Sequence, residues 1–255
     1  MTIVAGLPLV ILLVTLGGFW LRVALLGLSL AGLYEFYRAL SKKVLAIHFS
    51  GYLVAVLYYL LVIGYGSLAY LLVILSAFML LTFSMLVIFY QKISVQDSLI
   101  TIGGFFYIPF LLSFIYFVRE ENIYFVWLIF ISASASDTCA YLVGRTLGRH
   151  KLMGTPSPGK TWEGCVGGVL GAALVGLLYG HIVGGALSAV VISIMGAAFS
   201  QFGDLFASAI KRSAGIKDFG RILPGHGGVL DRFDSIIVTA PVVYMVMIGI
   251  GYLGI

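Results

Sequence analysis

The sequence contains very little charge: Asp, Glu, Lys and Arg make up 10% of its 255 residues, whereas soluble domains carry about 25%. This shortage excludes a soluble globular enzyme, a disordered chain and a soluble nucleic-acid-binding domain. Cysteine is also scarce, and Cys139 and Cys165 match no metal-binding or disulfide spacing. A secreted domain held together by disulfides is therefore excluded, and both thiols are expected to be small, buried apolar side chains.

Apolar residues, in contrast, make up 61% of the chain, and the mean hydropathy is +1.12. They form long runs, each close to the roughly 20 residues that cross a bilayer as a helix, which predicts an all-α membrane bundle of about eight or nine spans. The runs cover residues 3–18, 20–37, 50–64, 66–90, 98–118, 122–143, 163–184, 186–209 and 235–254. Only Gly17 and Gly18 separate the first two runs, which form either two helices or one long, kinked helix.

The basic residues fall between the apolar runs. The excess of Lys and Arg follows the second, fourth, sixth and eighth runs, so it lies on one side of the membrane. By the positive-inside rule this side is cytoplasmic, which predicts a multi-pass protein of the cell (inner) membrane with its polar loops facing the cytoplasm. The net charge of +5 thus indicates membrane orientation and no nucleic-acid partner.

Charge is concentrated in the second half of the chain. Between Asp137 and Asp234 lie 9 of the 15 Lys and Arg residues and 6 of the 10 Asp and Glu residues. We therefore predict that residues 1–130 form a transmembrane scaffold and residues 131–255 a transmembrane catalytic region, within one membrane-embedded unit. The chain has no convincing internal repeat, so it does not support a transporter built from inverted repeats.

A first polar block begins at Asp137. On a helix, Asp137, Tyr141 and either Gly144 or Arg145 share one face. A carboxylate near the end of a span is costly unless it faces a wet cavity or a partner. The block predicts a polar face that lines a site, and a purely structural Asp137–Arg145 pair is the alternative.

A second polar block, residues 154–164, contains two prolines and is predicted to be a loop. Thr161 is suited to cap the following helix, with Glu163 in its first turn. The Gly-Lys-Thr piece is not a P-loop, because the required glycine spacing and a preceding strand are absent. Ser157 and Lys160 beside a helix N-terminus suit a phosphate group, and the alternative is an ordinary solvated loop.

A third block places Asp204, Ser208 and either Lys211 or Arg212 in one stripe of a helix. Asp204 lies within an apolar run, where an unpaired charge is expensive. A bound cation would account for it, since hard divalent cations use one or two carboxylates together with waters and substrate phosphates.

A fourth block, residues 219–234, contains the Pro224–Gly228 turn, whose backbone amides are open to a ligand. Asp231 and Asp234 are three residues apart on the first turn of the last helix. They repel each other unless a cation or a cationic side chain joins them. His226 either anchors this loop or acts as an acid or base.

Together the four blocks supply carboxylates for Mg²⁺, cationic side chains for phosphates and a glycine loop for close approach. These groups suit phosphoryl or nucleotidyl transfer, in which positioning and charge neutralisation provide most of the catalysis. One substrate would be a water-soluble nucleotide and the other a lipid.

The third and fourth blocks resemble the C-terminal fingerprint of the phosphatidate cytidylyltransferase (CDP-diacylglycerol synthase) family. The matching residues run without a gap over 27 positions: Ser208, Lys211-Arg212, Lys217-Asp218, His226-Gly227-Gly228 and Asp231-Arg232-Phe233-Asp234. The first block and the loop from Ser157 to Gly164 also resemble the family. The N-terminal half resembles it only in being a multispan scaffold.

This resemblance implies that CTP and phosphatidate give CDP-diacylglycerol and pyrophosphate with Mg²⁺ as the cofactor, and it leaves open whether a second cation such as K⁺ joins. It also implies a homodimer. The metal ligands implied are Asp204 and Asp231 first, then Asp218 and Asp234. The catalytic residues implied are Lys211, Arg212, Lys217, His226 and Arg232. The substrate-binding residues implied are Asp137, Arg145, Ser157, Lys160, Thr161, Ser208, Gly227 and Gly228.

Two other functions stay open. A CTP-dependent lipid kinase of the polyprenol or phytol type shares part of this chemistry, although the continuous His-Gly-Gly-x-x-Asp-Arg-x-Asp run argues against it. A cation-coupled transporter would also bury Asp and Arg, but its charges should lie near the midplane of the membrane. Here they gather at the ends of the apolar runs.

Overall fold

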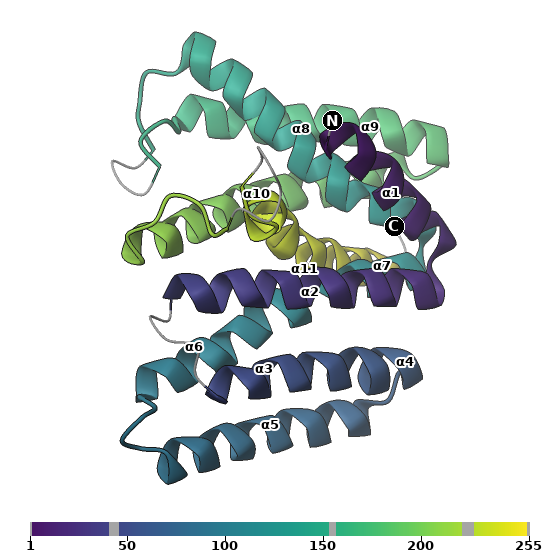
Figure 1. Cartoon of the computed structure of the whole chain (residues 1–255). Helices are drawn as coiled ribbons and strands as arrows, with labels where there is room; N and C mark the ends of the chain where they lie inside the picture. Colours follow the sequence, from purple (N-terminus) through teal and green to yellow (C-terminus); the bar gives the residue numbers. More distant parts are fainter. Residues whose placement is uncertain (1, 41–45, 153–156, 221–226, 254–255) are drawn as a thin grey trace. The chain divides into compact units, whose positions relative to one another are not determined.

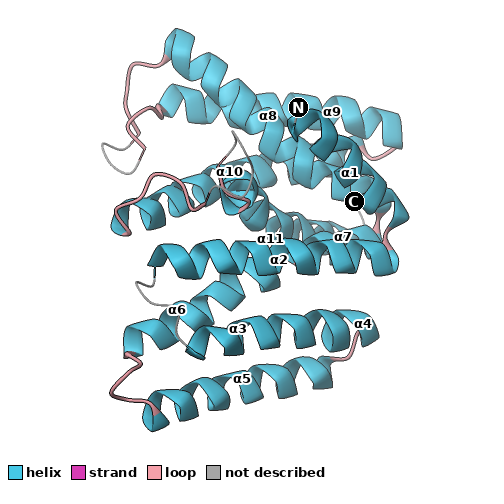
Figure 2. Cartoon of the chain, in the orientation of Figure 1, coloured by secondary structure: helices cyan, strands magenta, loops and turns pink. Residues whose placement is uncertain are grey.

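The computed structural model describes residues 2–40, 46–152, 157–220 and 227–253, and over these ranges the chain forms helices joined by short turns (Figure 2). Within them there is no strand, and extended structure is limited to isolated bridge residues such as the pair Lys151 and Thr161. The prediction of an all-α protein is confirmed.

Eight helices of the described ranges are long and apolar enough to cross a membrane, so this is a multi-pass membrane protein. They are Gly18–Leu40, Ile47–Tyr65, Leu68–Ile88, Val95–Glu121, Ile123–Leu147, Trp162–Val183, Ala186–Ser213 and Leu230–Gly251. The first apolar run forms a separate helix, α1 (Thr2–Leu16). Gly17 and Gly18 divide it from the next helix with φ angles of 63° and 46°, which favour glycine.

The chain divides into two compact units. The first unit contains residues 1–113 and 218–231, and the second contains residues 114–217 and 232–255. The helices of the first unit are α1, α2 (Gly18–Leu40), α3 (Ala46–Leu57), α4 (Ile63–Tyr65), α5 (Leu68–Ile88) and α6 (Val95–Phe105). The second unit has α7 (Phe114–Glu121), α8 (Ile123–Leu147), α9 (Trp162–Val183), α10 (Ala186–Ser213) and most of α11 (Leu230–Leu253).

In the first unit α3 packs against α2, α5 and α6 (Figure 1). Two of its spans contain a π-helical turn, η1 (Tyr58–Val62) and η2 (Phe106–Phe110). Pro109 lies in η2, where it cannot donate to the helical ladder. Tyr59 of η1 donates its hydroxyl to the Pro109 carbonyl at 3.2 Å, so the disturbed backbone and a buried tyrosine satisfy each other.

In the second unit α8, α9 and α10 pack side by side (Figure 1). Buried glycines form one face of α9, at Gly164, Gly168, Gly176 and Gly180. A Cβ atom added at Gly168 would lie 2.8 Å from the Gln201 amide nitrogen of α10 and from the Ser136 carbonyl oxygen of α8. The absence of side chains on this face therefore allows the three helices to approach closely, and it brings their polar residues together.

Candidate active site

The second unit contains a cavity of about 360 Å³ where residues of α8, α9, α10 and the loop before α9 meet. Its lining consists of Asp137, Ala140, Tyr141, Gly144, Arg145, Gly159, Lys160, Thr161, Gly164, Cys165, Gln201 and Asp204. The first, second and third polar blocks of the sequence therefore converge on one cavity. The lining combines two carboxylates with an ammonium and a guanidinium group.

An ion pair crosses this cavity. The Lys160 ammonium nitrogen, on the loop before α9, lies 2.6 Å from the Asp204 carboxylate of α10. The nitrogen is buried, and among the described residues it has no hydrogen-bond partner in addition to this ion pair. Lys160 therefore forms a close ion pair with Asp204, and both groups line the cavity. This burial of the nitrogen does not fit an ordinary solvated loop.

Asp137 supplies the second carboxylate of the cavity. It lies close enough to Asp204 and Lys160 to interact electrostatically with both. About two turns further along α8, the Arg145 guanidinium donates to the Tyr141 hydroxyl at 3.3 Å. Among the described residues there is no ion pair between Asp137 and Arg145, so the purely structural pair is the wrong alternative. Both side chains face the cavity because helical spacing places them on the same face.

A hairpin presents Lys160 to the cavity. The backbone nitrogen of Trp162 donates to the His150 carbonyl at 3.0 Å, and that of Leu152 donates to the Lys160 carbonyl at 2.9 Å. Thr161 caps α9, as predicted, by accepting a hydrogen bond from the Gly164 amide at 3.1 Å. These bonds set the backbone on both sides of Lys160. Ser157 is the other loop residue that the sequence predicted. Its carbonyl accepts a hydrogen bond from the Lys160 amide at 3.3 Å, but the residue does not line the cavity.

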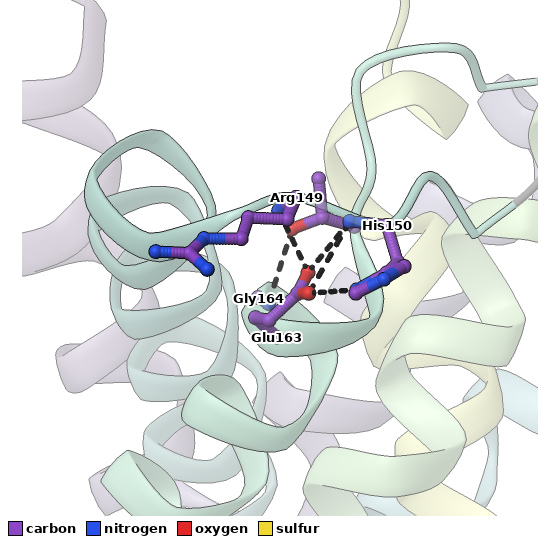
Figure 3. A network of polar contacts seen from close by, with 5 residues as sticks. Arg149, His150, Glu163 and Gly164 are labelled. Atoms are coloured by element: carbon purple, nitrogen blue, oxygen red, sulfur yellow. Dashed lines mark hydrogen bonds and ion pairs between the residues drawn. The ribbon is translucent and has the colours of Figure 1, made fainter.

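Glu163 ties the base of this hairpin together (Figure 3). Its carboxylate accepts hydrogen bonds from the backbone amides of Arg149 at 3.1 Å and His150 at 3.2 Å. The His150 imidazole Nδ1 lies 2.6 Å from the same carboxylate. Sequence reasoning placed Glu163 only in the first turn of α9, and it missed this anchoring role because the partners lie 13 and 14 residues earlier.

Gln201 is a cavity residue that sequence reasoning did not select. Its amide nitrogen donates to the Ser136 hydroxyl of α8 and to the Cys165 carbonyl of α9, both at 3.0 Å. It thereby joins three helices next to the Lys160–Asp204 pair. A buried amide three residues before Asp204 in an apolar run was the available signal. The two cysteines are half-buried, contrary to expectation, and Cys165 lines the cavity.

The remaining residues of the third block follow α10 to its end. The Ser208 hydroxyl lies 3.4 Å from the Asp204 carboxylate, which confirms the predicted stripe. Lys211 is half-buried, whereas Arg212 is exposed and donates to the Ile216 carbonyl at 3.4 Å. Lys217 beyond the helix is also exposed.

Residues 232–234 of the fourth block belong to the second unit. Asp234 is buried, with 8% of its surface exposed. It accepts a hydrogen bond from the Ser235 amide at 2.8 Å and interacts electrostatically with Asp204, Asp137 and Lys211. The second unit therefore gathers three carboxylates near one another. Arg232 is exposed.

Residues 218–231 of the fourth block belong to the first unit. Asp231 accepts hydrogen bonds from the Phe219 amide at 2.9 Å and from the Gly228 amide at 3.1 Å, both through Oδ2. Gly227 has a φ angle of 83°, as expected for a glycine turn. Asp218 is exposed. His226 lies outside the described residues.

The number and arrangement of the carboxylates bear on whether the site can hold a metal ion. Within the part of the chain that the structure describes, no group of three or more His, Cys, Asp or Glu side chains is arranged to hold one. Mg²⁺ commonly needs only one or two carboxylates when substrate phosphates and waters complete its shell. Asp204 already binds a cationic group, the Lys160 ammonium. This pairing fits a hard cation that is held jointly with a phosphate-bearing substrate.

Comparison with known proteins decides the family. The family model described as "Cytidylyltransferase family" matches residues 1–249. The chain belongs to the cytidylyltransferase family. It is thus a nucleotidyltransferase, and the resemblance found in its sequence is confirmed.

Individual relatives agree with this membership. The chain is 36% identical over 177 residues to a phosphatidate cytidylyltransferase of Staphylococcus saprophyticus. This alignment covers 68% of this chain and 67% of the relative. It is 34% identical over 175 residues to one of Staphylococcus haemolyticus, covering 68% and 66%. With one of Staphylococcus aureus the identity is 35% over 161 residues, covering 62% of each chain. The alignments thus span about two thirds of each relative or slightly less.

Proposed function

We propose that this cytidylyltransferase transfers the cytidylyl group of CTP to phosphatidate, forming CDP-diacylglycerol and pyrophosphate with Mg²⁺. The observation that carries the proposal is the cavity of the second unit, where Asp137, Arg145, Lys160 and Asp204 converge. Its two cationic groups suit phosphates and its two carboxylates suit a divalent cation. The names of the relatives point to the same pair of substrates.

In this reaction an oxygen of the lipid phosphate attacks the α-phosphorus of CTP. The bond between the α-phosphorus and its bridging oxygen to the β-phosphorus breaks, and pyrophosphate leaves with the electron pair. No covalent bond to the enzyme forms. Lys160 and Arg145 are positioned to neutralise phosphate oxygens, and removal of one such preorganised donor typically lowers kcat by about a hundredfold to a thousandfold.

The Lys160–Asp204 pair exchanges partners when CTP binds. A triphosphate in the cavity offers Lys160 an anion with more charge and more acceptor oxygens than one carboxylate. Lys160 then turns its N–H groups to the phosphates, and the Asp204 carboxylate becomes available as a metal ligand together with Asp137. These two carboxylates would hold Mg²⁺, which would supply positive charge to stabilise the departing pyrophosphate.

The other predicted site residues complete the proposal. Asp231, Asp218 and Asp234 are the further metal ligands that we propose, and Ser208, Gly227 and Gly228 contact the substrates. Charge neutralisation and proton transfer fall to Lys211, Arg212, Lys217, Arg232 and His226. The catalytic region is residues 131–255 on the scaffold of residues 1–130, at the cytoplasmic face of the inner membrane. The active form is a homodimer, and K⁺ is a candidate second cation.

The experiment uses the full chain purified in detergent, with phosphatidate, Mg²⁺ and CTP labelled at either its α- or its γ-phosphorus. We expect the α-label to enter the lipid and the γ-label to leave as pyrophosphate. Omission of phosphatidate, or chelation of Mg²⁺, should stop both events. Transfer of the γ-label to a lipid alcohol would replace the proposal with a lipid kinase, and the absence of any CTP turnover would leave transport as the better function.

A further inference from the structure

A buried carboxylate of the first unit is not used in the proposed reaction. Glu35 lies in the apolar span α2, where only 1% of its surface is exposed. A carboxylate at such a position is costly unless hydrogen bonds satisfy it. Its two oxygens accept hydrogen bonds from the backbone amides of Val229 at 3.0 Å and Leu230 at 2.8 Å. Glu35 is thus hydrogen-bonded to a segment that lies more than 190 residues later in the sequence.

These two amides lie at the start of α11, which begins at Leu230. The first amides of a helix have no acceptor within the helix, and they carry the positive end of the helix dipole. Glu35 therefore caps α11 from another helix, with a charge of the favourable sign. Because α2 supplies this cap, Asp231 is not needed for it. Its Oδ2 instead accepts hydrogen bonds from the Phe219 and Gly228 amides, at the two described ends of the preceding loop.

Two glycines of this loop pack directly on the Glu35 carboxylate. A Cβ atom added at Gly228 would lie 2.6 Å from its Oε2, and one added at Gly220 would overlap its Oε1. Only residues without a side chain can approach the carboxylate so closely. Glu35 therefore contacts the loop at both Gly220 and Gly228, and it bonds to the two residues immediately before Asp231.

We infer that Glu35 is a positioning residue for cytidylyl transfer. It sets the backbone of the Gly227–Asp231 segment from the scaffold helix α2, and through that backbone it aims the Asp231 carboxylate and the glycine amides. It does not itself touch a substrate. The inference rests on the proposed function, because that function gives Gly227, Gly228 and Asp231 their roles.

Glu35→Gln tests the inference with almost no change in volume. One carboxylate oxygen is replaced by the NH2 group of the amide, which faces a backbone N–H donor. One hydrogen bond and the negative charge are therefore lost. Because small displacements of reacting groups are costly, kcat should fall about tenfold to a hundredfold, with a smaller change in the KM for CTP. Hydrogen exchange read by mass spectrometry should become faster in peptides covering residues 227–233 and stay unchanged in peptides from α8 and α9.

Ser29→Ala is the matched control. Ser29 is fully buried on the same helix, and its hydroxyl lies 3.1 Å from the Tyr59 hydroxyl. The variant also loses a buried hydrogen bond of α2, but away from the loop. Its melting temperature should fall, while kcat and the exchange of residues 227–233 stay at the wild-type level. If Glu35→Gln keeps the wild-type kcat, or if Ser29→Ala loses as much activity, Glu35 has no positioning role.

Glu35→Asp provides a second test if the glutamine variant does not fold. It keeps the charge and withdraws the carboxylate by one methylene group, so kcat should again fall and exchange of residues 227–233 should again increase. An aspartate variant with wild-type kcat and wild-type exchange would overturn the inference. If the wild-type protein makes no CDP-diacylglycerol, the proposed function fails, whereas the exchange experiment still decides whether Glu35 orders this segment.

Discussion

The pair formed by Lys160 and Asp204 can be tested with a double-mutant cycle. Lys160→Met removes the ammonium group and keeps most of the apolar stem, and Asp204→Asn removes the negative charge at nearly constant volume. Each single variant leaves the other charge without its partner. The double variant removes both charges, so the two losses of stability should not add.

The expected magnitude follows from the geometry of the pair. At 2.6 Å, two unit charges attract each other by about 6 kcal/mol at an effective dielectric constant of about 20. Desolvation offsets most of this attraction, and water still reaches side chains that are 23% and 31% exposed. We therefore expect a coupling free energy of about 1–3 kcal/mol, measured as differences in the free energy of unfolding in detergent.

Activity gives an independent result from the same three variants. Each single variant should lose about a hundredfold to a thousandfold in kcat, because each lacks a charge that the reaction uses. The double variant should regain stability but no activity. Additive losses of stability would show that the pair does not interact, and single variants within about tenfold of wild-type kcat would show that this cavity is not the active site.

Three further predictions concern the surroundings of the cavity and the membrane orientation. Glu163→Gln should lower the melting temperature and kcat, because the hairpin loses charge-assisted hydrogen bonds. Glu121→Gln, at the exposed end of α7, should leave both unchanged in melting and CTP turnover assays. A Cβ atom at Gly167 would lie 2.6 Å from Val143, so Gly167→Ala should destabilise the protein by about 1–3 kcal/mol. Gly103→Ala is the control, because a Cβ atom there would meet open space. Equal melting temperatures of the two variants would refute the packing argument. An impermeant maleimide applied to intact cells should label a cysteine placed at Glu121 and not one placed at Lys151, and the reverse pattern would invert the proposed topology.

Much of the fold and part of the site follow from local sequence. Apolar runs of the length of a bilayer predict the spans, since a helix must satisfy its own backbone inside lipid. The Thr161 cap and the Asp204–Ser208 stripe were predicted correctly because capping and one-turn spacing depend only on neighbouring residues. The interrupted spans were not predicted. The carbonyl of Pro109 in one π turn accepts a hydrogen bond from Tyr59, which comes from another span.

Periodicity, the length of the apolar runs and an ungapped motif are short-range properties, so they were sufficient to predict the membrane class, the helices and the family. Which charges meet depends instead on how the helices pack. Lys160 pairs with Asp204 and Gln201 bridges three helices because a glycine face lets α9 approach its neighbours. Glu35 reaches the start of α11 across more than 190 residues of sequence. No helical period encodes such contacts, since they depend on how the assembled helices pack.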